Sequence, residues 1–254
     1  MLQQRVIDTV LFDIGNTLLD FESLDPRVYF AEGFRLGYEY LSSRGHALPS
    51  FERYTRVMRR VLLWRYIRSR LMRREMLFFE SMIVAHKFVG ITLDYDSAVE
   101  LAWQAYLPMR RAGRADRDAR KMLIELRTRG YKLGLISNTG TPPTALDRHL
   151  REEDDLLEFF AMRVYSCDVG YMKPHRRIFE IALDRIGSAA ANTVYVGDKP
   201  KLDVKGAGRL GMLTVLKSPR GEPVDGRWLP DHVVRRLAEL PGILESYSLP
   251  CPSN

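Results

Sequence analysis

Asp13 stands at the end of an apolar segment, where a carboxylate can serve as a nucleophile or a metal ligand. It follows the run VLF, residues 10–12, and precedes a turn-forming Gly-Asn pair at 15–16. A short apolar run is typical of a buried parallel strand, and in open α/β sheets ligands bind at the carboxyl ends of such strands. The simpler alternative is a strand and a hairpin turn that leave Asp13 on the surface. This segment alone does not decide between the two, but three later segments do.

Two of these segments offer groups that bind an anion. Residues 132–136 form a mostly apolar run, and Ser137-Asn138 follow it directly. A turn of this type can hold a phosphate with a hydroxyl and backbone amides. Lys173 precedes a predicted helix, whose N-terminal dipole also favours anions. Taken singly, the Ser-Asn pair is explained as a helix cap and Lys173 as a surface lysine.

Two more carboxylates follow the apolar run at 193–196. Asp198 comes two residues after that run, and Asp203 comes five residues later. Carboxylates at adjacent strand ends form an oxygen-rich site suited to Mg²⁺, although Asp198 alone would be an ordinary turn residue. Together with Asp13, the three segments predict a nucleophile, an anion-binding turn, a lysine and two more acids at one edge of a sheet.

The elements that must position these residues alternate between strand and helix from residue 113 onwards. Strands separated by helices are typical of a parallel sheet. The fold class is therefore predicted as α/β, with a doubly wound parallel sheet. The pattern predicts strands at 132–136, 162–166, 193–196 and 213–216, helices at 115–129, after the Pro-Pro pair at 142–143, at 174–186 and up to 210, and a short strand and helix in the tail.

A helical block separates the first strand from the others. Between residues 19 and 113 the apolar residues recur with helical spacing, and Pro, Gly and Asp residues mark the helix ends. We therefore expect two domains, with residues 1–20 and 113–254 as the α/β core and residues 21–112 as an inserted all-helical domain. Four amphipathic helices are predicted, at 26–44, from 49 to about 70, at 75–89 and at 94–111.

The composition is that of a soluble globular protein, with 46% hydrophobic and 28% charged residues in a chain of 254. The net charge of +7 comes from arginine, since only eight of the 39 basic residues are lysine, and it suits anionic substrates. Arg5, Asp8 and Asp13 interrupt the N-terminal apolar run, which argues against a signal peptide. No apolar stretch is long enough to cross a bilayer, and Cys167 and Cys251 show no metal-binding spacing. We therefore expect a cytoplasmic protein with no membrane association.

The second predicted helix is unusual in its charge. Residues 53–74 contain nine arginines and no acid. One interpretation is a face that binds nucleic acid or phosphate, and the other is a solvated helix face whose arginine stems cover apolar neighbours. Apolar residues are interleaved with the arginines on more than one side, and no nucleic-acid recognition motif accompanies the charge. Ordinary amphipathicity is the favoured interpretation, so no nucleic-acid partner is expected.

In this order the four segments resemble the motifs of the haloacid dehalogenase (HAD) superfamily, across nearly the whole chain. Asp13 corresponds to the family's nucleophile, Ser137 to its phosphate-binding serine or threonine, and Lys173 to its lysine. Asp198 and Asp203, in VGDKPKLD, correspond to the acidic fourth motif. The resemblance implies a HAD-like Rossmannoid core. It also implies that the helical insert is a first-type cap, which closes over the site and selects the substrate.

The activity that the resemblance implies is Mg²⁺-dependent hydrolysis of a small phosphomonoester. Asp13 would attack phosphorus and form an aspartyl-phosphate, which water then hydrolyses. Lys173 and Mg²⁺ would neutralise the phosphoryl oxygens. The implied metal ligands are the carboxylates of Asp13, Asp198 and Asp203 and the carbonyl of Gly15, and the implied substrate-binding residues are Ser137, Asn138 and Thr17.

One position departs from the family pattern. Family phosphatases read D-x-D-x-T, and the second Asp is their general acid and base, whereas Gly15 stands there in this chain. The Gly15 carbonyl can still bind a metal, but proton transfer loses help that is typically worth about 10²–10⁴-fold. A residue of the helical insert could replace it, for example His46, His86 or a tyrosine, although a given histidine is more often structural.

The same departure leaves other functions open. Family members that cleave carbon–halogen bonds also lack the second Asp, but they lack the metal as well, so Asp198 and Asp203 count against that reaction. Phosphonate-cleaving members keep Mg²⁺ and use a cap lysine, for which Lys87 is the sole candidate in the insert. A further alternative is a phosphate- or metal-binding protein with weak or no catalysis. The sequence identifies neither the substrate nor the oligomeric state.

Overall fold

The chain forms two compact units in the computed structural model, which describes residues 6–21, 25–71, 77–221 and 226–247. Unit 1 comprises residues 1–20, 115–138 and 151–254, and unit 2 comprises residues 21–114 and 139–150. Residues 139–150, which the sequence pattern assigned to the core, group with the helical unit by their contacts. The domain boundaries at 20/21 and 112/113 stay a prediction, and the two units are described separately below.

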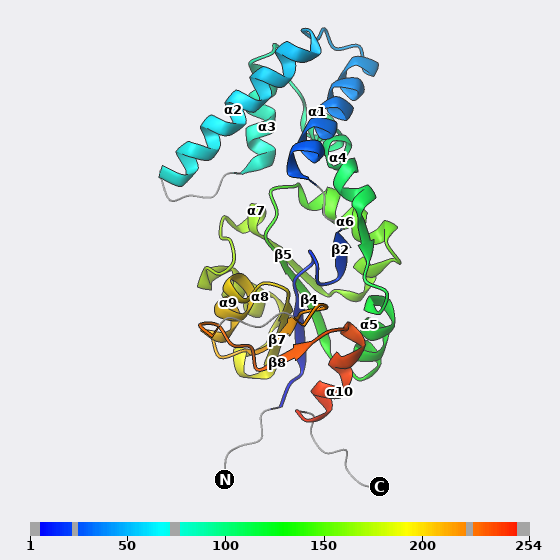
Figure 1. Ribbon diagram of the computed structural model, residues 1–254, viewed down its shortest axis with the longest axis vertical. Coiled ribbons are helices and arrows are strands. Elements are labelled where there is room, and N and C mark those ends of the chain that lie inside the picture. Colours follow the sequence, from blue (N-terminus) through cyan, green and yellow to red (C-terminus); the bar gives the residue numbers. More distant parts are fainter. Residues whose placement is uncertain (1–5, 22–24, 72–76, 222–225, 248–254) are drawn as a thin grey trace. The chain divides into compact units, whose positions relative to one another are not determined.

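A six-stranded sheet forms the centre of unit 1, and all of its neighbouring strands pair in parallel (Figure 1). The four-residue β1 is fully buried, as expected for a parallel sheet covered on both faces. The α/β class with a doubly wound parallel sheet is confirmed. The strand order is β5 (Met162–Tyr165), β4 (Lys132–Ser137), β1 (Thr9–Phe12), β6 (Thr193–Gly197), β7 (Leu213–Lys217) and β8 (His232–Val234).

Helices cover both faces of this sheet. On one side lie α8 (Arg176–Ile186) and α9 (Lys205–Gly208), and on the other lie α5 (Ala119–Thr128) and α10 (Leu240–Glu245) (Figure 1). Phe179 of α8 is fully buried against the sheet residue Tyr195, with ring centroids 5.3 Å apart in an edge-to-face arrangement. These two layers hold the central strands, and therefore their carboxyl ends, in fixed register.

A small two-stranded sheet was not predicted. It consists of β2 (Leu19–Phe21) and β3 (Gly113–Ala115), at the points where the chain leaves and re-enters unit 1. The predicted helix at 115–129 therefore begins only at Ala119. Its start is held by Asp116, whose backbone N–H donates to Leu18 O and whose carboxylate accepts the N–H of Asp118.

The ends of two other elements also differ from the sequence pattern. The helix predicted at 174–186 begins at Arg176, because the His175 ring caps it by accepting the N–H of Arg177, and the Lys173–Pro174 peptide bond is cis. The helix predicted up to 210 opens with one π-helical turn over Pro200–Val204 before α9.

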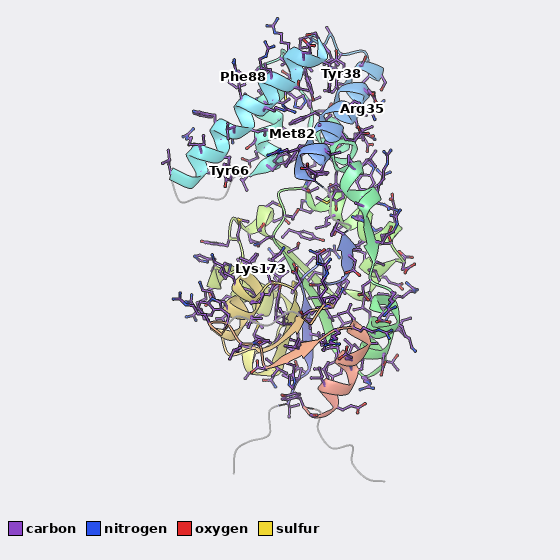
Figure 2. All side chains as sticks on the ribbon, viewed as in Figure 1. Arg35, Tyr38, Tyr66, Met82, Phe88 and Lys173 are labelled. Atoms are coloured by element: carbon purple, nitrogen blue, oxygen red, sulfur yellow. The ribbon has the colours of Figure 1, made fainter. Side chains whose placement is uncertain are left out.

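Unit 2 contains the predicted helical insert. Its helices are α1 (Pro26–Ser43), α2 (Phe51–Leu71), α3 (Phe78–Lys87) and α4 (Tyr95–Ala112), joined by most of α6 (Pro143–Glu152). Asp25 and Asp94 cap α1 and α4 by accepting backbone N–H groups with their side chains. Tyr38 packs edge-on against the buried Tyr54, and Met82 lies in the same core (Figure 2). The arginine-rich helix buries Tyr54 and Met58 on this side and exposes most of its arginines.

Four sequence features fall outside the described residues: Arg5, the predicted start of the third helix at Glu75, the end of the arginine-rich segment at Arg73 and Arg74, and Cys251. Within the described residues, no helix combines the length and the apolar character needed to span a bilayer.

Candidate active site

The predicted site residues follow the three central strands of the sheet. Phe12, the last residue of β1, is level with Leu135 of β4 and Val196 of β6. Asp13 comes next on the middle strand, and its backbone N–H donates to Val196 O at 2.9 Å. Ser137 ends the strand on one side and Asp198 follows the strand on the other. The structure therefore brings the three segments to one edge of the sheet.

Lys173 is the centre of the hydrogen-bond network at this edge. Its ammonium donates to Asp13 Oδ1 at 2.6 Å, to Asp203 Oδ1 at 2.7 Å and to the hydroxyl of Tyr195 at 3.0 Å. The side chain is buried inside unit 1 (Figure 2). All three N–H donors of the ammonium are thus used. The carboxylates of Asp13, the candidate nucleophile, and Asp203 both bond to this one cation.

Asn138 holds the backbone of Lys173 in place. Its side-chain oxygen accepts the N–H of Lys173 at 2.7 Å, and its amide nitrogen donates to Lys173 O at 3.1 Å. These two bonds tie the loop after β4 to the segment that carries Lys173. The contact of Asn138 with substrate stays a prediction. Its two bonds to the backbone of Lys173 show that it helps to position that residue.

Asp203 is held by protein donors at both carboxylate oxygens. Oδ1 accepts from Lys173 and, at 3.3 Å, from the hydroxyl of Tyr195, while Oδ2 accepts the N–H of Lys199 at 2.9 Å. The carboxylate lies so close to Gly197 that a Cβ built there would be 2.4 Å from Asp203 Cγ. This close approach explains why a glycine precedes Asp198.

Three carboxylates lie close enough together that they could hold a metal ion. Asp13, Asp198 and Asp203 each offer one oxygen, and these atoms lie within 4.8 Å of one another. Oδ1 of Asp198 is buried and has no hydrogen-bond partner among the described residues. A buried carboxylate oxygen without a partner is costly, and hard cations such as Mg²⁺ prefer such oxygens. The residues therefore fit a metal ion, with Asp13 and Asp198 better placed than the fully engaged Asp203 to donate directly.

The protonation of these groups follows from their burial. Burial raises the pKa of Asp13, and the charge of Asp203 adds to this, while Lys173 opposes it. Burial also raises the pKa of Asp198 to about 6. For Lys173 burial acts to lower the pKa, but the charges of Asp13 and Asp203 outweigh it and the net shift is upward. A cluster of three carboxylates around one ammonium is short of positive charge, and a bound cation would relieve this.

The turn between Asp13 and β2 carries the remaining predicted residues. Ile14 O accepts the N–H groups of Leu18 and Leu19 at 3.0 and 2.9 Å, which closes the turn around Gly15. Thr17 is buried, and its hydroxyl has no partner among the described residues. Ser137 is also buried. Both hydroxyls lie on segments that border Asp13, and their contact with a substrate stays a prediction.

Two residues at this edge were missed by the sequence analysis. Tyr195 lies within the strand predicted at 193–196 and was not singled out, although its hydroxyl contacts both Lys173 and Asp203. Lys217 ends β7 and is buried, and it donates to Thr17 O at 2.9 Å, Asp20 Oδ1 at 2.7 Å and Asp116 Oδ2 at 2.7 Å. The signal that identified Asp13 and Asp198, a polar residue directly after an apolar strand, would have identified Lys217 as well.

Comparisons with known proteins agree with this geometry. A family model described as haloacid dehalogenase-like hydrolase matches residues 7–211. The crystal structure of a 2-haloacid dehalogenase from Pseudomonas syringae pv. Tomato DC3000 has a similar fold, with a TM-score of 0.66 over 96% of this chain and 100% of that chain at 23% identity. At that identity the likeness concerns the fold alone.

Two relatives in sequence are named as phosphatases. A glyceraldehyde 3-phosphate phosphatase of Pyrococcus abyssi is 41% identical over 97 residues, which is 38% of this chain and 40% of that protein. A phosphoserine phosphatase of Thermus thermophilus is 34% identical over 145 residues, 57% of each chain. The match thus spans only about half of the length of these relatives. The family model, in contrast, covers most of the chain, and with the site at the carboxyl ends of its strands the protein belongs to the haloacid dehalogenase-like hydrolases.

Proposed function

We propose that this protein is a Mg²⁺-dependent phosphatase that hydrolyses a small phosphomonoester through an aspartyl-phosphate on Asp13. The observation that carries the proposal is the unpartnered, buried Oδ1 of Asp198 beside Asp13, whose other neighbour is the ammonium of Lys173. A metal site next to a carboxylate nucleophile suits phosphoryl transfer, in which catalysis is mainly positioning and charge stabilisation.

Each residue has a role that its contacts support. Asp13 attacks phosphorus, the ester P–O bond breaks, and the alkoxide leaves with the bonding electrons and takes a proton from water. A second water then attacks the phosphorus of the aspartyl-phosphate, loses a proton to solvent, and releases phosphate and the Asp13 carboxylate. Lys173 neutralises phosphoryl oxygens. Its hydrogen bonds to Asp203 and Tyr195 hold the ammonium in a fixed position. Ser137 and the backbone amides that follow it bind the phosphoryl group.

A magnesium ion would be held by Asp13, Asp198 and the carbonyl of Gly15, with Asp203 supporting. When bound, the ion supplies electrostatic stabilisation of the phosphoryl oxygens. Asp203 acts mainly through Lys173, because both of its oxygens already accept hydrogen bonds from the protein.

Two alternatives to phosphate ester hydrolysis gain little from the structure. Carbon–halogen cleavage needs no metal, whereas the unpartnered oxygen of Asp198 fits one. Phosphonate cleavage would depend on Lys87, an exposed residue at the end of α3. His86 is a poor substitute for the missing acid, because its two ring nitrogens bond to Tyr54 and to Met82 O inside the helical core.

The test is phosphate release from p-nitrophenyl phosphate and from a panel of small phosphomonoesters, with MgCl₂ and with EDTA. We expect turnover with MgCl₂ only, and none above background for Asp13→Asn. Asp184→Asn, an exposed change on α8, is the matched control and should behave as wild type. Equal turnover by Asp13→Asn and wild type would disprove the proposal, as would a folded wild-type protein that is inert toward every ester.

A further inference from the structure

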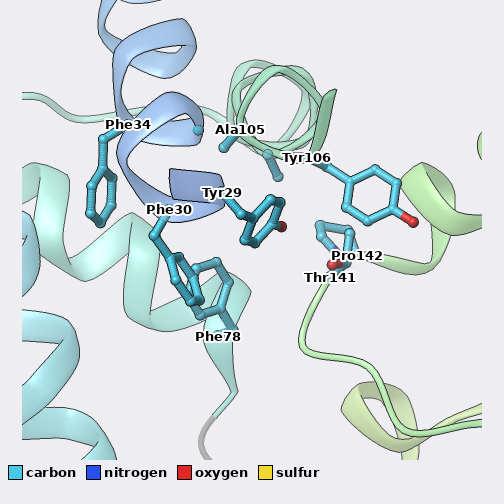
Figure 3. A pocket seen from close by; sticks show the side chains of 10 residues that line it. Tyr29, Phe30, Phe34, Phe78, Ala105, Tyr106, Thr141 and Pro142 are labelled. Atoms are coloured by element: carbon cyan, nitrogen blue, oxygen red, sulfur yellow. The ribbon is translucent and has the colours of Figure 1, made fainter. Parts of the chain in front are cut away.

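Unit 2 contains an apolar pocket of about 40 Å³, lined by ten residues of α1, α3, α4 and the segment 141–142 (Figure 3). None of these residues carries a charge at neutral pH. Aromatic rings such as those of Phe30, Phe34 and Phe78 form much of the wall, and a wall of this kind accepts many small organic groups. The pocket therefore identifies no ligand class, whereas a charged surface on unit 1 identifies the charge of its ligand.

This charged surface lies at the ring of Trp228. The ammonium of Lys205 lies 4.7 Å from the ring centroid, and the guanidinium carbons of Arg209 and Arg227 lie 5.4 and 5.6 Å from it. Lys201 comes four residues before Lys205 on the same helical segment. We call these four basic residues the Trp228 cluster, and all of them belong to unit 1.

The sequence places these cations side by side. Lys201, Lys205 and Arg209 recur every four residues along the π-helical turn and α9, and residues four apart are neighbours on a helix surface. Trp228 belongs to the connection between β7 and β8, drawn in orange beside α9 in Figure 1. Lys201, Arg209 and Arg227 are exposed, so at least three of the four charges face solvent.

No acid neutralises the Trp228 cluster within the part of the chain that the structure describes. The charges that act on the Lys205 ammonium are those of Arg209, Lys201 and Arg227, and all three are positive. None of the four cations forms an ion pair with a described carboxylate. The surface therefore carries four positive charges that the described residues leave uncompensated.

Trp228 and the neighbouring acid Asp231 do not remove this charge. The indole ring attracts cations through its π-face, but it has no charge that could neutralise them. Asp231, three residues after Trp228, is engaged elsewhere, since its Oδ2 accepts the N–H and the hydroxyl of Thr214. The ring thus holds the cations together against their mutual repulsion and leaves them available to an anion.

The positive charge is concentrated in a small area. No two of the three groups at the ring are more than about 11 Å apart, which is close to the Debye length of about 8–10 Å in physiological salt. Their fields therefore overlap, and an anion placed among them is attracted by several cations at once. A ligand with several negative charges within a few ångströms gains more from this arrangement than a ligand with one.

We propose that the Trp228 cluster binds an oligophosphate group, a chain of two or three phosphates that is either free or part of a nucleotide. Such a chain joins its phosphorus atoms through single bridging oxygens, so its charges are closer together than those of a nucleic acid backbone or an acidic peptide. Arginine binds phosphate oxygens in a bidentate manner, and lysine binds them as a point charge. No residue of the cluster is among those assigned to the reaction at Asp13, and binding here does not depend on the proposed function.

Calorimetry with tripolyphosphate tests the proposal on the wild-type protein in EDTA, where no metal-dependent turnover occurs. We expect tripolyphosphate to bind at least tenfold more tightly than orthophosphate, with an affinity that falls as NaCl is raised. ATP distinguishes the two sources: an affinity no higher than that of tripolyphosphate shows that the phosphate chain alone is recognised, and a higher affinity identifies a nucleotide. No measurable binding of tripolyphosphate at low salt, or an affinity no higher than that of orthophosphate, would overturn the proposal.

A matched pair of double variants locates the binding. Lys205→Gln with Arg209→Gln removes two charges of the Trp228 cluster, and Lys121→Gln with Arg151→Gln removes the same charges at exposed positions of α5 and α6. The first should weaken tripolyphosphate binding at least tenfold, and the second should change it less than twofold. Unchanged affinity in the first double variant, or equal losses in both, would contradict the site. Arg227→Gln, a single exposed change, should weaken binding about threefold and decides the question if the first double variant does not fold.

Extended polyanions are the competing occupants of this surface. A short single-stranded RNA and an oligoglutamate peptide, measured in the same buffer, should bind more weakly than tripolyphosphate. Tighter binding of either, lost in Lys205→Gln with Arg209→Gln, would show that the surface takes a nucleic acid or an acidic protein segment and would overturn the oligophosphate assignment. All of these measurements are made without turnover, so the proposed function can fail without changing their result.

Discussion

Asn16 is the residue that takes the left-handed conformation in the turn after β1, with a φ of 55°, and Gly15 does not have a positive φ. Asparagine tolerates this region better than most residues. The positive φ of this turn is therefore taken by an asparagine and not by a glycine. Under the proposed function, an aspartate at position 15 would supply the acid that Gly15 lacks.

Restoring the acid is the first prediction at the residue scale. Gly15→Asp should raise kcat for an alkyl phosphate by about 10²-fold or more, because general acid help is worth about 10²–10⁴-fold. The gain for an aryl phosphate should be smaller, since an aryl oxide leaves without a proton. Gly15→Asn is the control, as it has nearly the same shape and cannot transfer a proton.

Steady-state rates on one aryl and one alkyl phosphate check this prediction, with folding followed by melting temperature. Equal wild-type rates on the two esters would mean that another group already supplies the proton. The double change Gly15→Asp with Asn16→Gly reproduces the family pattern more fully and guards against a local clash. A folded double mutant still inert toward both esters would favour a protein that binds phosphate without hydrolysing it.

Asp198 gives the second prediction at this scale. Asp198→Asn keeps the shape of the side chain and removes its charge, so Mg²⁺-dependent turnover should fall by about 100-fold or more, as expected for the loss of a metal-site group. The increase in melting temperature on adding MgCl₂ should disappear. In EDTA the variant should be no less stable than wild type, because the carboxylate it replaces is buried without a partner.

Calorimetry with MgCl₂ and thermal melts test the metal assignment, with Asp184→Asn as the exposed control. Wild type and Asp198→Asn binding Mg²⁺ with the same affinity would show that the metal assignment is wrong.

At the scale of elements, the sequence predicted the strands that are short apolar runs and the helices whose ends are marked by Pro, Gly or Asp residues. The strands at 132–136 and 193–196 were found within one residue at each end, because a buried parallel strand is a short apolar run bounded by polar turns. The missed elements depend on contacts distant in sequence. β2 pairs with β3 more than ninety residues later, and the start of α5 is set by Asp116 and Leu18. No local pattern carries that information.

The candidate site was predictable for the same reason that the strands were. Asp13, Ser137 and Asp198 each follow or end an apolar run, and parallel strands bring such positions to one edge. Tyr195 was not predictable, because a tyrosine within a strand looks like core and only the approach of Lys173 gives its hydroxyl a role. The pocket of unit 2 was equally hidden, since its lining comes from four separate segments.

His86 gives the prediction at the scale of elements, because it joins α3 to α2. Its Nε2 lies 2.9 Å from the hydroxyl of Tyr54 and its Nδ1 lies 2.8 Å from Met82 O. Burial lowers the pKa of His86, the bond to Met82 O opposes this, and His46 adds a small lowering effect. In the unfolded chain the pKa returns to about 6.5, so the unfolded state binds the proton more readily.

The sign of the pH dependence follows from this difference. The free energy of unfolding should be constant with respect to His86 above about pH 6.5 and should fall as the pH drops below it, by at most about 1.4 kcal/mol per pH unit. Guanidinium titrations between pH 5 and pH 8 measure this. In His86→Gln the contribution of His86 to the pH dependence of the free energy of unfolding should be lost. Tyr54→Phe should lower the free energy of unfolding by about 1 kcal/mol and retain that pH dependence. An unchanged slope in His86→Gln would contradict the prediction.

At the scale of the whole molecule, Lys217 lies where the chain leaves and re-enters unit 1. Its ammonium bonds to Asp20, the last residue before unit 2, and to Asp116, which follows the return. The pair with Asp116 is buried, and the Asp20 side chain is 54% exposed. Since exposed ion pairs are worth about 0–1 kcal/mol, the Asp116 pair carries most of the energy.

Lys217→Met should therefore destabilise the protein by about 3–5 kcal/mol, the usual cost of leaving a buried charge unpaired. The double change Lys217→Met with Asp116→Leu removes the stranded carboxylate and should recover a large part of that loss. A double-mutant cycle measured by guanidinium unfolding tests this, with Lys132→Met, which alters an exposed lysine, as the control. Strictly additive losses at 217 and 116 would show that the two side chains do not act as a pair.

The division of unit 2 into two stretches of sequence also has a consequence for domain exchange. Residues 21–114 look like a removable insertion, whose ends meet in the short β2–β3 pair. However, residues 139–150 pack with them: His149 bonds to Tyr106 of α4, and Arg148 lies 4.1 Å from the Trp103 ring centroid. The segment that begins just after Ser137-Asn138 is thus structurally part of the helical unit. A chimaera that grafts a relative's helices onto this core must therefore carry both stretches, residues 21–114 and 139–150.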